Sequence, residues 1–453
     1  MKKSSDNRVL IGLDLGTGAL KGVAVAPDGQ LMAVATVPNP LLYPRPGWVE
    51  QDPAAHYQAV CALLRELTGQ VQGPVAGLAM AAAAGNTLLC DGHGVPLTNI
   101  INWMDQRAVD APPRRLQDFD AATVHRVTGW PCVTSFPLAH LSWLQEHQAE
   151  LYRRTEWFCM NSDWLLFRLT GLRRIDVSTA TTFHLLDQCS GQWHPPFLER
   201  LGIRPEQLSQ PVESGIQVGT LTAAAARDTG LTPGIPVVSG CFDHPAAARA
   251  AGILAPGQLL LSCGTSWVGL LPDPDRERIL RTDMLCDPFL SRTHGVWGGI
   301  FSVPAIGPAV DWYLEHVIAP GATAPYRQFD ELAAAVPPGA HGLTIDLRQP
   351  PCPLSAAPGD VARAVMESAA RLLAEKLAEL RRHGFHFTRA VMVGGPSRST
   401  VWPGIVAAAT GLQLTVGDRY AGALGAALLA GIGTGLYHDE TNAWHQAGIH
   451  HEY

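Results

Sequence analysis

A carboxylate, a glycine-rich turn and a lysine follow one another closely near the N-terminus. In the stretch LDLGTGALK, Asp14 precedes Gly16, Thr17 and Gly18, and Lys21 comes three residues later. Such turns present backbone N–H donors without obstruction by side chains, as a concave nest that suits phosphate. Lys21 would bring its ammonium group to the same phosphates, and Asp14 would hold a metal ion through water. This spacing predicts a phosphate-binding turn.

A second loop repeats the pattern in the other half of the chain. The stretch LLLSCGTSW places Gly264, Thr265 and Ser266 after an apolar run, as LDLGTG does at the start. An ordinary β-hairpin would explain either loop alone. Two such loops, together with the glycine-ended strand VMVGG at 391–395, favour an internal duplication and a nucleotide bound between two halves.

A third signal is the aspartate in SGCFDHPAAA. An apolar strand runs out into Asp243, and Pro245 is placed to begin a helix. The carboxylate would then lie at the C-terminal end of a strand, where open α/β sheets bind ligands. Transfer of a phosphoryl group to an alcohol needs a base aimed at the hydroxyl, and an aspartate serves. The alternative is that Asp243 only caps the helix, and the two roles are compatible.

Length, composition and charge narrow the class of protein. With 453 residues the chain exceeds one hydrophobic core, so at least two domains and a cleft between them are expected. A hydrophobic fraction of 47% with 16% charged residues is typical of a globular protein. The net charge of -7 argues against nucleic acid or an anionic membrane as partner, and favours small molecules.

The cysteines and the N-terminus predict a cytoplasmic protein. The nine cysteines include no CxxC pair and lie mostly in apolar stretches, as reduced and buried cysteines do. The start MKKSSDNRVL has no apolar signal-peptide core, and no long uncharged apolar run follows.

Hydrophobic periodicity predicts mixed strands and helices, and therefore an α/β fold. Strands are expected at 8–15, 20–26, 31–37 and 74–81, with Asp28-Gly29 as a tight turn. A helix is expected at 51–70, with Asp52 as N-cap and Pro53 at the first helical position. A long helix is expected at 359–384, capped by Asp360 and ended by Gly384.

The ordered set of motifs resembles the FGGY carbohydrate kinases, which share the actin-like ATPase fold. The matching segments span nearly the whole chain: LDLGTGALK, PGWVEQDP, NWMDQRA, SDWLLFRLTG, DVSTATT, SGCFDHPAAA, SCGTSW and VGGPSRSTVW with ALGAALLAG. The resemblance implies two actin-like (ribonuclease H-like) domains with mixed sheets flanked by helices and an interdomain cleft. Residues 1–237 would form the sugar and phosphate side, and 238–453 would supply the catalytic base and the nucleotide side.

The resemblance also implies roles for individual residues. Asp243 would be the catalytic base. Thr17, Gly18, Lys21, Gly264 and Thr265 would contact the phosphates. Gly394 and Gly395 would lie beside adenosine, Ser399 near the base, and Gly307 on the nucleotide side. Trp103 and Asp105 fall in the segment that helps to form the sugar pocket. The cofactors implied are ATP and Mg²⁺, and family members are often homodimers.

Three departures from the family pattern bear on the substrate. Relatives place polar sugar-reading residues where this chain has Ala83, Ala84 and Gly85, so Asn86 is the one polar side chain left there. The loop after Leu343 is shorter than in many relatives. His244 follows Asp243 where glutamine or asparagine is common, and it can still bond a sugar hydroxyl.

The leading hypothesis is an ATP-dependent kinase for a small ketose, deoxy sugar or polyol. The alternatives are a sensor or interaction protein of the same fold with impaired catalysis, which the alanine-rich pocket wall motivates, and an actin-like chaperone or filament ATPase. The sequence does not select the sugar.

Overall fold

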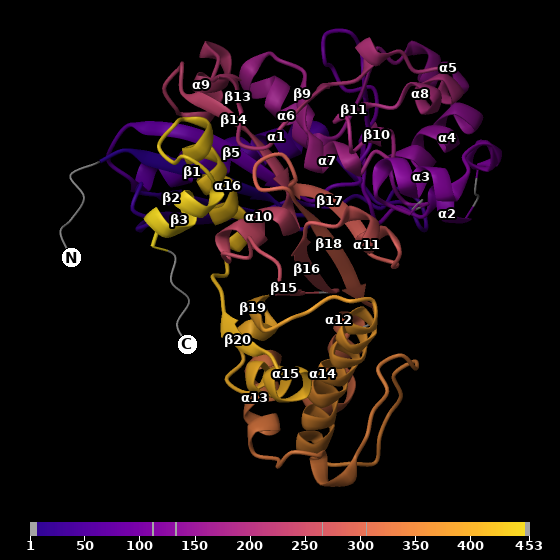
Figure 1. Cartoon of the computed structure of the whole chain (residues 1–453), viewed down its shortest axis with the longest axis vertical. Coiled ribbons are helices and arrows are strands. Elements are labelled where there is room, and N and C mark those ends of the chain that lie inside the picture. The colour runs from indigo at the N-terminus through magenta and orange to yellow at the C-terminus, as the bar shows by residue number, and fades with distance from the viewer. Residues whose placement is uncertain (1–6, 111–112, 132–133, 265, 305, 449–453) are drawn as a thin grey trace. The chain divides into compact units, whose positions relative to one another are not determined.

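The computed structural model describes residues 7–110, 113–131, 134–264, 266–304 and 306–448. The chain divides into two compact units (Figure 1). Unit 1 comprises residues 1–252, 285–297 and 420–449, and unit 2 comprises 253–284, 298–419 and 450–453. Each unit contains a mixed sheet with helices packed against it, as the predicted α/β class requires.

The sheet of unit 1 has the order β13-β14-β5-β1-β2-β3. Its strands are β1 (Val9–Leu15), β2 (Ala19–Val25), β3 (Leu31–Pro38), β5 (Val75–Ala82), β13 (Gln217–Thr220) and β14 (Pro236–Phe242). The strands β14, β5 and β1 run parallel, whereas β2 and β3 return antiparallel. The turn at Asp28-Gly29, where Gly29 has φ 79°, joins β2 to β3 as predicted.

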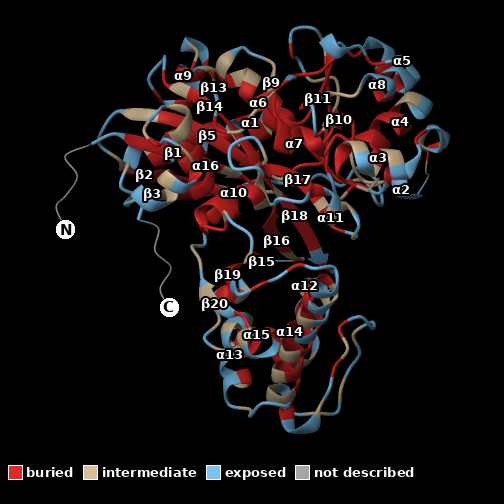
Figure 2. Cartoon of the chain, in the orientation of Figure 1, coloured by how far each residue is buried: buried red, intermediate tan, exposed pale blue. Residues whose placement is uncertain are grey.

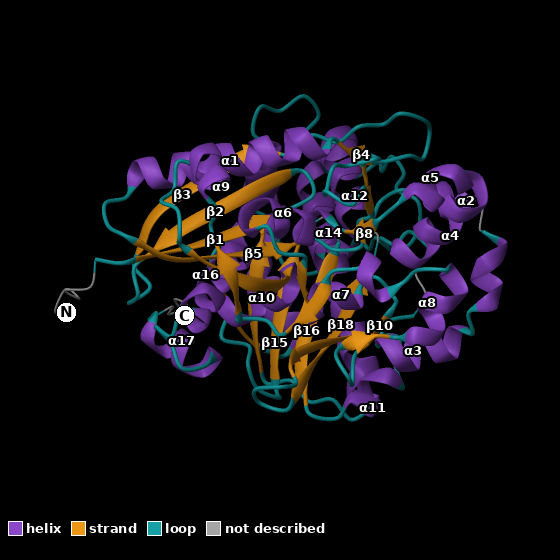
Figure 3. Ribbon diagram, turned by 90° about the horizontal axis from the view of Figure 1, so that it is seen from above, coloured by secondary structure: helices purple, strands orange, loops and turns teal. Residues whose placement is uncertain are grey.

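Helix α1 (Pro53–Gln70) covers β2 and β3 (Figure 3). The carboxylate of Asp52 accepts hydrogen bonds from the backbone N–H groups of Ala54 and Ala55, and Pro53 occupies the first turn, which confirms the predicted start. Leu63 and Leu67 of this helix are fully buried in the same core as Leu13 of β1. Their burial holds the hairpin against the rest of unit 1.

The close packing of helix α16 (Ala421–Gly433) explains its run of small residues. It lies against β1 and β5 and also against α10 (Asp243–Ala250), although it comes from the far end of the chain (Figure 1). A methyl group at Gly12 would lie 1.9 Å from the carbonyl oxygen of Ala423, and one at Gly425 would lie 1.8 Å from that of Ala246. Backbones in such contact leave no room for side chains, so α16 fixes β1 and α10 in place.

The remainder of unit 1 consists of short helices and short paired strands. The helices are α2 (Arg107–Asp110), α3 (Ala121–Thr128), α4 (Pro137–His147), α5 (Ala149–Arg154), α6 (Asn161–Thr170), α7 (Val177–Thr181), α8 (Pro195–Leu201), α9 (Ala223–Thr229) and α17 (Glu440–Gln446). The strand pairs are β4 (Glu50–Gln51) with β7 (Ile100–Ile101), β6 (Leu88–Cys90) with β8 (Trp157–Cys159), β9 (Arg174–Asp176) with β12 (Gln210–Val212), and β10 (Leu186–Asp187) with β11 (Gln192–Trp193). Strand β17 (Leu285–Leu290) also belongs to unit 1.

The sheet strands of unit 2 lie in the order β18-β16-β15-β19-β20, as part of a six-stranded sheet. Its strands are β15 (Gln258–Cys263), β16 (Trp267–Asp273), β18 (Val296–Val303), β19 (Arg389–Gly394) and β20 (Gln413–Val416). Its helices are α11 (Arg276–Leu280), α12 (Ile306–Tyr313), α13 (Pro325–Ala334), α14 (Pro358–Arg382) and α15 (Trp402–Thr410). The parallel set β20, β19 and β15 followed by antiparallel β16 repeats the order β14, β5, β1 and β2, which fits an internal duplication.

The compact units follow a different division from the expected domains, whose boundary at residue 237 stays a prediction: β14 continues into α10 and both pack with unit 1, as does α16. One predicted helix cap needs correction. Helix α14 begins at Pro358, with Ala357 as N-cap, so Asp360 lies in the first turn and does not cap it. Its carboxylate instead contacts Nδ1 of His341 at 2.8 Å. The side of α14 that packs against α13 and α15 is buried (Figure 2).

Among the described residues, no helix combines the length and the apolar character needed to cross a membrane.

Candidate functional site

The predicted phosphate turn joins β1 to β2 in unit 1. Asp14 and Lys21 lie opposite each other in the antiparallel register, with residues 16–18 forming the turn beyond them. Gly18 has open space where a side chain would project. The structure therefore brings Asp14, the turn and Lys21 together at one end of the sheet, as the spacing predicted.

Polar side chains that the sequence reasoning missed hold the carbonyl groups of this turn. The amide of Asn39 donates to the carbonyl oxygen of Gly16 at 2.9 Å, and that of Gln51 donates to Thr17 O at 3.2 Å. The backbone N–H of Asn39 donates to Gly18 O at 3.1 Å. With its carbonyls fixed from one side, the turn has little conformational freedom left, which favours a preorganised anion site.

A buried chain of polar groups supports Asn39 in turn. Nδ1 of His56 lies 2.9 Å from Asn39 Oδ1, and Nε2 lies 3.5 Å from the amide of Asn161. Burial lowers the pKa of His56 to about 4, so the ring is neutral at physiological pH. A neutral ring can accept at one nitrogen and donate at the other, as this chain requires.

Asp14 is held in a strained electrostatic environment. Burial, and then the carboxylate of Asp243, raise the pKa of Asp14 to about 6, while Lys21 opposes the shift. A methyl group at Gly422 of α16 would lie 2.9 Å from Asp14 Oδ2, so this helix packs directly on the carboxylate. Two carboxylates that repel each other beside a phosphate turn are a setting that a cation would stabilise.

Asp243 lies at the end of β14, as predicted, but α10 begins at Asp243 and not at the predicted Pro245. It is the first residue of α10, and Phe242 is the N-cap, so Asp243 is not the capping residue. Its Oδ1 accepts a hydrogen bond from the backbone N–H of His244 at 2.6 Å. The side chains of Asp243 and His244 are 29% and 22% exposed, and the His244 ring lies 3.8 Å from the carboxylate. Both side chains are therefore accessible to a ligand.

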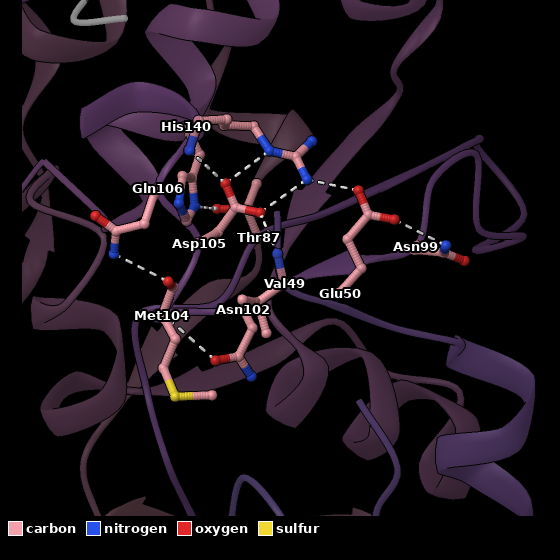
Figure 4. Close-up of polar contacts among 10 residues, drawn as sticks. Val49, Glu50, Thr87, Asn99, Asn102, Met104, Asp105, Gln106 and His140 are labelled. Atoms are coloured by element: carbon pink, nitrogen blue, oxygen red, sulfur yellow. Dashed lines mark hydrogen bonds and ion pairs between the residues drawn. The ribbon is translucent and has the colours of Figure 1, made fainter. Parts of the chain in front are cut away.

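Asp105 occupies a different environment from the one expected of a sugar-binding residue. Its carboxylate accepts hydrogen bonds from Val49 N at 2.7 Å, from Arg107 N at 2.9 Å and from the Arg107 guanidinium at 2.8 Å and 2.9 Å (Figure 4). The side chain is fully buried, and Arg107 also pairs with Glu50 at 2.5 Å. With its lone pairs engaged, Asp105 orders the 102–107 segment and does not face a ligand.

Trp103 and Asn86, the other two residues expected near the sugar, occupy different environments. Trp103 is 37% exposed, and its indole N–H donates to the hydroxyl of Thr17 at 2.9 Å, so it adjoins the phosphate turn. Asn86 is buried, and its amide donates to Ala83 O and to Asn161 Oδ1. Asn86 thus ends the polar chain that runs through His56 to the turn.

Unit 2 contains a cavity of about 790 Å³. Four residues predicted on the nucleotide side line it together: Gly264, Gly307, Gly395 and Ser399. Its walls also include Trp267, Trp402, Tyr326, Arg327 and Arg398. Aromatic side chains around a cavity of this size suit a purine base. The charged lining is mixed, because Asp311, Asp330 and Glu331 lie there beside the two arginines. Ser266 adjoins Gly264 and is exposed, and Thr265 lies outside the described residues.

Asp330 of α13, another residue that the sequence reasoning missed, also lines this cavity. Its carboxylate accepts hydrogen bonds from the Ser399 hydroxyl and from Thr400 N at 2.7 Å. The Ser399 oxygen in turn accepts from the backbone N–H of Trp402 at 2.8 Å. Ser399 therefore fixes the turn into α15, in addition to lining the cavity.

Gly394 and Gly395 offer a matched pair for testing this loop. Gly394 has φ 96°, and a methyl group there would lie 2.1 Å from Cys263 O, whereas one at Gly395 would meet nothing within 4 Å. We expect Gly394→Ala to destabilise unit 2 by roughly 2–4 kcal/mol, because strain and clash add. Gly395→Ala should leave the melting temperature unchanged and weaken ATP binding. Calorimetry of both variants checks this, and equal melting temperatures would contradict it.

The described residues contain no cluster of three or more histidine, cysteine, aspartate or glutamate side chains placed to hold a metal ion. Mg²⁺ rarely needs such a cage, because it keeps several waters and binds through one or two carboxylates plus substrate phosphates.

Comparison with known proteins gives the family. Residues 9–249 match the N-terminal domain of the FGGY family of carbohydrate kinases, and residues 337–434 match its C-terminal domain. The chain therefore belongs to the FGGY family of carbohydrate kinases. Members of this family are ATP-dependent sugar kinases, so the protein is a phosphotransferase that acts on a hydroxyl group. The alternative of an inactive sensor finds no support there.

Individual relatives match along nearly the whole chain. The autoinducer-2 kinase of Klebsiella pneumoniae is 29% identical, over 96% of this chain and 89% of that protein. The xylulose kinase of Bacillus subtilis is 28% identical, over 95% and 89%. The crystal structure of xylulose kinase from Rhodospirillum rubrum superposes with a TM-score of 0.84 at 28% identity, and the match covers 96% of this chain and 92% of that one.

Proposed function

We propose that this protein transfers the γ-phosphate of ATP to a hydroxyl of a small ketose, deoxy sugar or polyol, with Asp243 as general base. The observation that carries the proposal is the position of Asp243: an accessible carboxylate at the end of β14, in the same unit as the phosphate turn and electrostatically coupled to Asp14. Asp243 would accept the proton of the attacking hydroxyl while the γ-phosphoryl group is transferred.

The residues of the phosphate turn would bind the phosphoryl group while it is transferred. Thr17 and Gly18 supply donors from the turn, and Lys21 supplies a positive charge on the strand opposite Asp14. Charge on the equatorial oxygens of a transferring phosphoryl group is stabilised most by donors that are already in place. The contacts of Asn39 and Gln51 to the turn provide that preorganisation.

Mg²⁺ fits the donor set at Asp14. Burial, and then the Asp243 carboxylate, raise the pKa of this carboxylate, which supports a cation beside it. Asp14 would hold the ion through water, and Mg²⁺ would neutralise charge on the β- and γ-phosphates when bound.

The cavity of unit 2 would bind the adenosine part of ATP. Gly264, Gly395 and Gly307 allow close approach of the ligand to the backbone, and Gly394 shapes the loop that carries Gly395. Ser399 would lie near the adenine, with its hydroxyl anchored by Asp330.

The names of the relatives support an acceptor class. The relatives named above act on xylulose and autoinducer-2 by their names, and the segment that the family resemblance assigns to the sugar carries Ala83, Ala84 and Gly85, which offer no polar side chain. We infer a short-chain acceptor, with His244 as its hydroxyl partner. The cytoplasmic location and the homodimer expected from the sequence remain predictions.

A panel assay tests the proposed function. Purified protein is incubated with ATP, Mg²⁺ and single acceptors, including D-xylulose, autoinducer-2, glycerol, deoxy sugars and aldoses, and ADP release is followed. We expect at least one ketose, deoxy sugar or polyol to raise ADP release more than tenfold over the rate without acceptor. Equal rates with every acceptor, while ATP still binds, would contradict the proposal.

A further inference from the structure

A closed ring of hydrogen bonds, most of them buried, includes the segment that carries Asp243. The backbone N–H of Phe242 donates to the hydroxyl of Ser178 at 3.2 Å, and that hydroxyl donates to Asp287 Oδ2 at 2.7 Å. Asp287 Oδ1 accepts from the backbone N–H of Phe289 at 2.8 Å. The ring thus links the residue before Asp243 to β17, which is about 45 residues further along the chain.

Arg249 closes the ring on the other side of Asp243. Its guanidinium donates to the carbonyl oxygen of Phe289 at 2.8 Å and to that of Pro245 at 3.2 Å. The same group lies 3.7 Å from Glu440 of α17. The backbone is therefore fixed one residue before Asp243 and two residues after it.

The ring also controls the carboxylate itself. Because Asp243 Oδ1 accepts from the N–H of His244, the side chain follows the backbone between Phe242 and Pro245. A small shift of that backbone would turn the carboxylate away from the acceptor hydroxyl. Misplacement by about 1 Å can lower the rate of a catalysed step about 100-fold.

Burying the charged and polar groups of the ring lowers the stability of the fold. Ser178, Asp287 and Arg249 are each at most 2% exposed, and burial raises the pKa of Asp287 to about 7, although Ser178 and Arg249 lower it. Well-packed apolar residues often give the same or greater stability than a buried ionic cluster. This cluster makes directional hydrogen bonds to backbone atoms on both sides of Asp243. Apolar side chains could not make such bonds.

We propose that Ser178, Asp287 and Arg249 are positioning residues that hold Asp243 in its reactive orientation. The inference rests on the proposed function, since it takes Asp243 as the base. It adds three residues, on α7, β17 and α10, that touch neither substrate in this account and act through the backbone of residues 242–245.

The chain contains a matched control for this cluster. Ser209 is also buried, accepts a hydrogen bond from the indole of Trp157 at 3.1 Å and donates to the buried Asp163 at 2.6 Å. Burial raises the pKa of Asp163 to about 7, as it does for Asp287. Ser209→Ala therefore removes the same kind of bond as Ser178→Ala, but among the described residues no hydrogen bond joins Ser209 or Asp163 to residues 242–245.

The experiment compares kcat, KM and melting temperature for these two variants. The probe is ATP with Mg²⁺ and D-xylulose, or the panel acceptor that gives faster turnover. We expect Ser178→Ala to lower kcat about 10- to 100-fold with both KM values within threefold, and Ser209→Ala to keep kcat within twofold at a similar melting temperature. Equal effects of the two variants on kcat would overturn the proposal.

Three further variants keep the test decisive. If Ser178→Ala does not fold, Asp287→Asn is compared with Asp163→Asn by the same criteria. Asp243→Asn is measured alongside: wild-type turnover in this variant would refute the proposed function, whereas an inactive Asp243→Asn with a normal Ser178→Ala would refute only the positioning role.

Discussion

Asp243→Asn is expected to lower kcat by at least about 1,000-fold while the dissociation constant for ATP stays within threefold. Loss of a positioned general base typically costs a factor of 10²–10⁴, and the amide also loses the negative charge that orients the attacking hydroxyl. The amide oxygen can still accept the hydrogen bond from His244 N, so local structure is retained. The nucleotide cavity is lined by residues of unit 2 alone, which is why ATP affinity should be unaffected.

Steady-state kinetics and ATP titration by calorimetry measure the two quantities. Asp52→Asn is the control, because Asp52 also places a carboxylate at a helix N-terminus in unit 1 and asparagine is an equally good N-cap. This control should retain wild-type kcat. An Asp243→Asn variant with more than a tenth of wild-type kcat would contradict the assignment of the base.

Asp14→Asn is expected to increase stability at pH 8 and to lower activity about 100-fold or more. The pKa of Asp14 is raised in the folded protein to about 6 from 3.8, so the folded state binds more protons than the unfolded state between those values. The free energy of unfolding therefore falls as pH rises through this window, and the full penalty is present above it. A pKa shift of about two units corresponds to about 3 kcal/mol of folding free energy. This value is an upper limit for the gain in stability of Asp14→Asn, because Lys21 loses its counter-charge in the variant.

Melting temperatures at pH 8 and pH 4, without ligands, test the stability effect. The variant should melt at a higher temperature than the wild type at pH 8 and close to it at pH 4. Mg²⁺ with ATP should raise the melting temperature of the wild type more than that of the variant, since Asp14 would hold the ion. Lower stability of Asp14→Asn at pH 8 would show that the carboxylate is not under electrostatic strain.

Local sequence signals predicted the elements that depend on near neighbours. The Asp28-Gly29 turn, the Asp52-Pro53 helix start and the strand that ends at Asp243 each rest on a few adjacent residues with strong conformational preferences. The β1 turn with Asp14 and Lys21 followed from the same kind of signal, because hairpin register places them opposite each other.

Groups that meet only through the tertiary fold were beyond this reasoning. Asn39 and Gln51 reach the phosphate turn from more than 20 residues away, and no spacing in the sequence marks them. Asp287 and Ser178 are 109 residues apart. The burial of Asp105 depends on Arg107 and on the remote Val49, so its motif alone did not reveal that its lone pairs are engaged.

The compact units likewise depend on contacts between distant parts of the chain. Helix α16 packs on β1, with backbone contact at Gly12, although more than 400 residues separate them. The small residues of this helix indicated close packing without identifying the partner. Only the fold shows that β1 and α10, which carry Asp14 and Asp243, share that one helix.

The most direct test of the account is to follow the phosphoryl group itself. Wild-type protein and Asp243→Asn are incubated with ATP labelled at the γ-phosphate, Mg²⁺ and the panel acceptor that gives the highest ADP release, and the sugar product is analysed by mass spectrometry. The account predicts one labelled sugar phosphate per ADP with the wild type, and almost none with the variant. Label appearing only in inorganic phosphate, or equal sugar phosphate from both proteins, would contradict it.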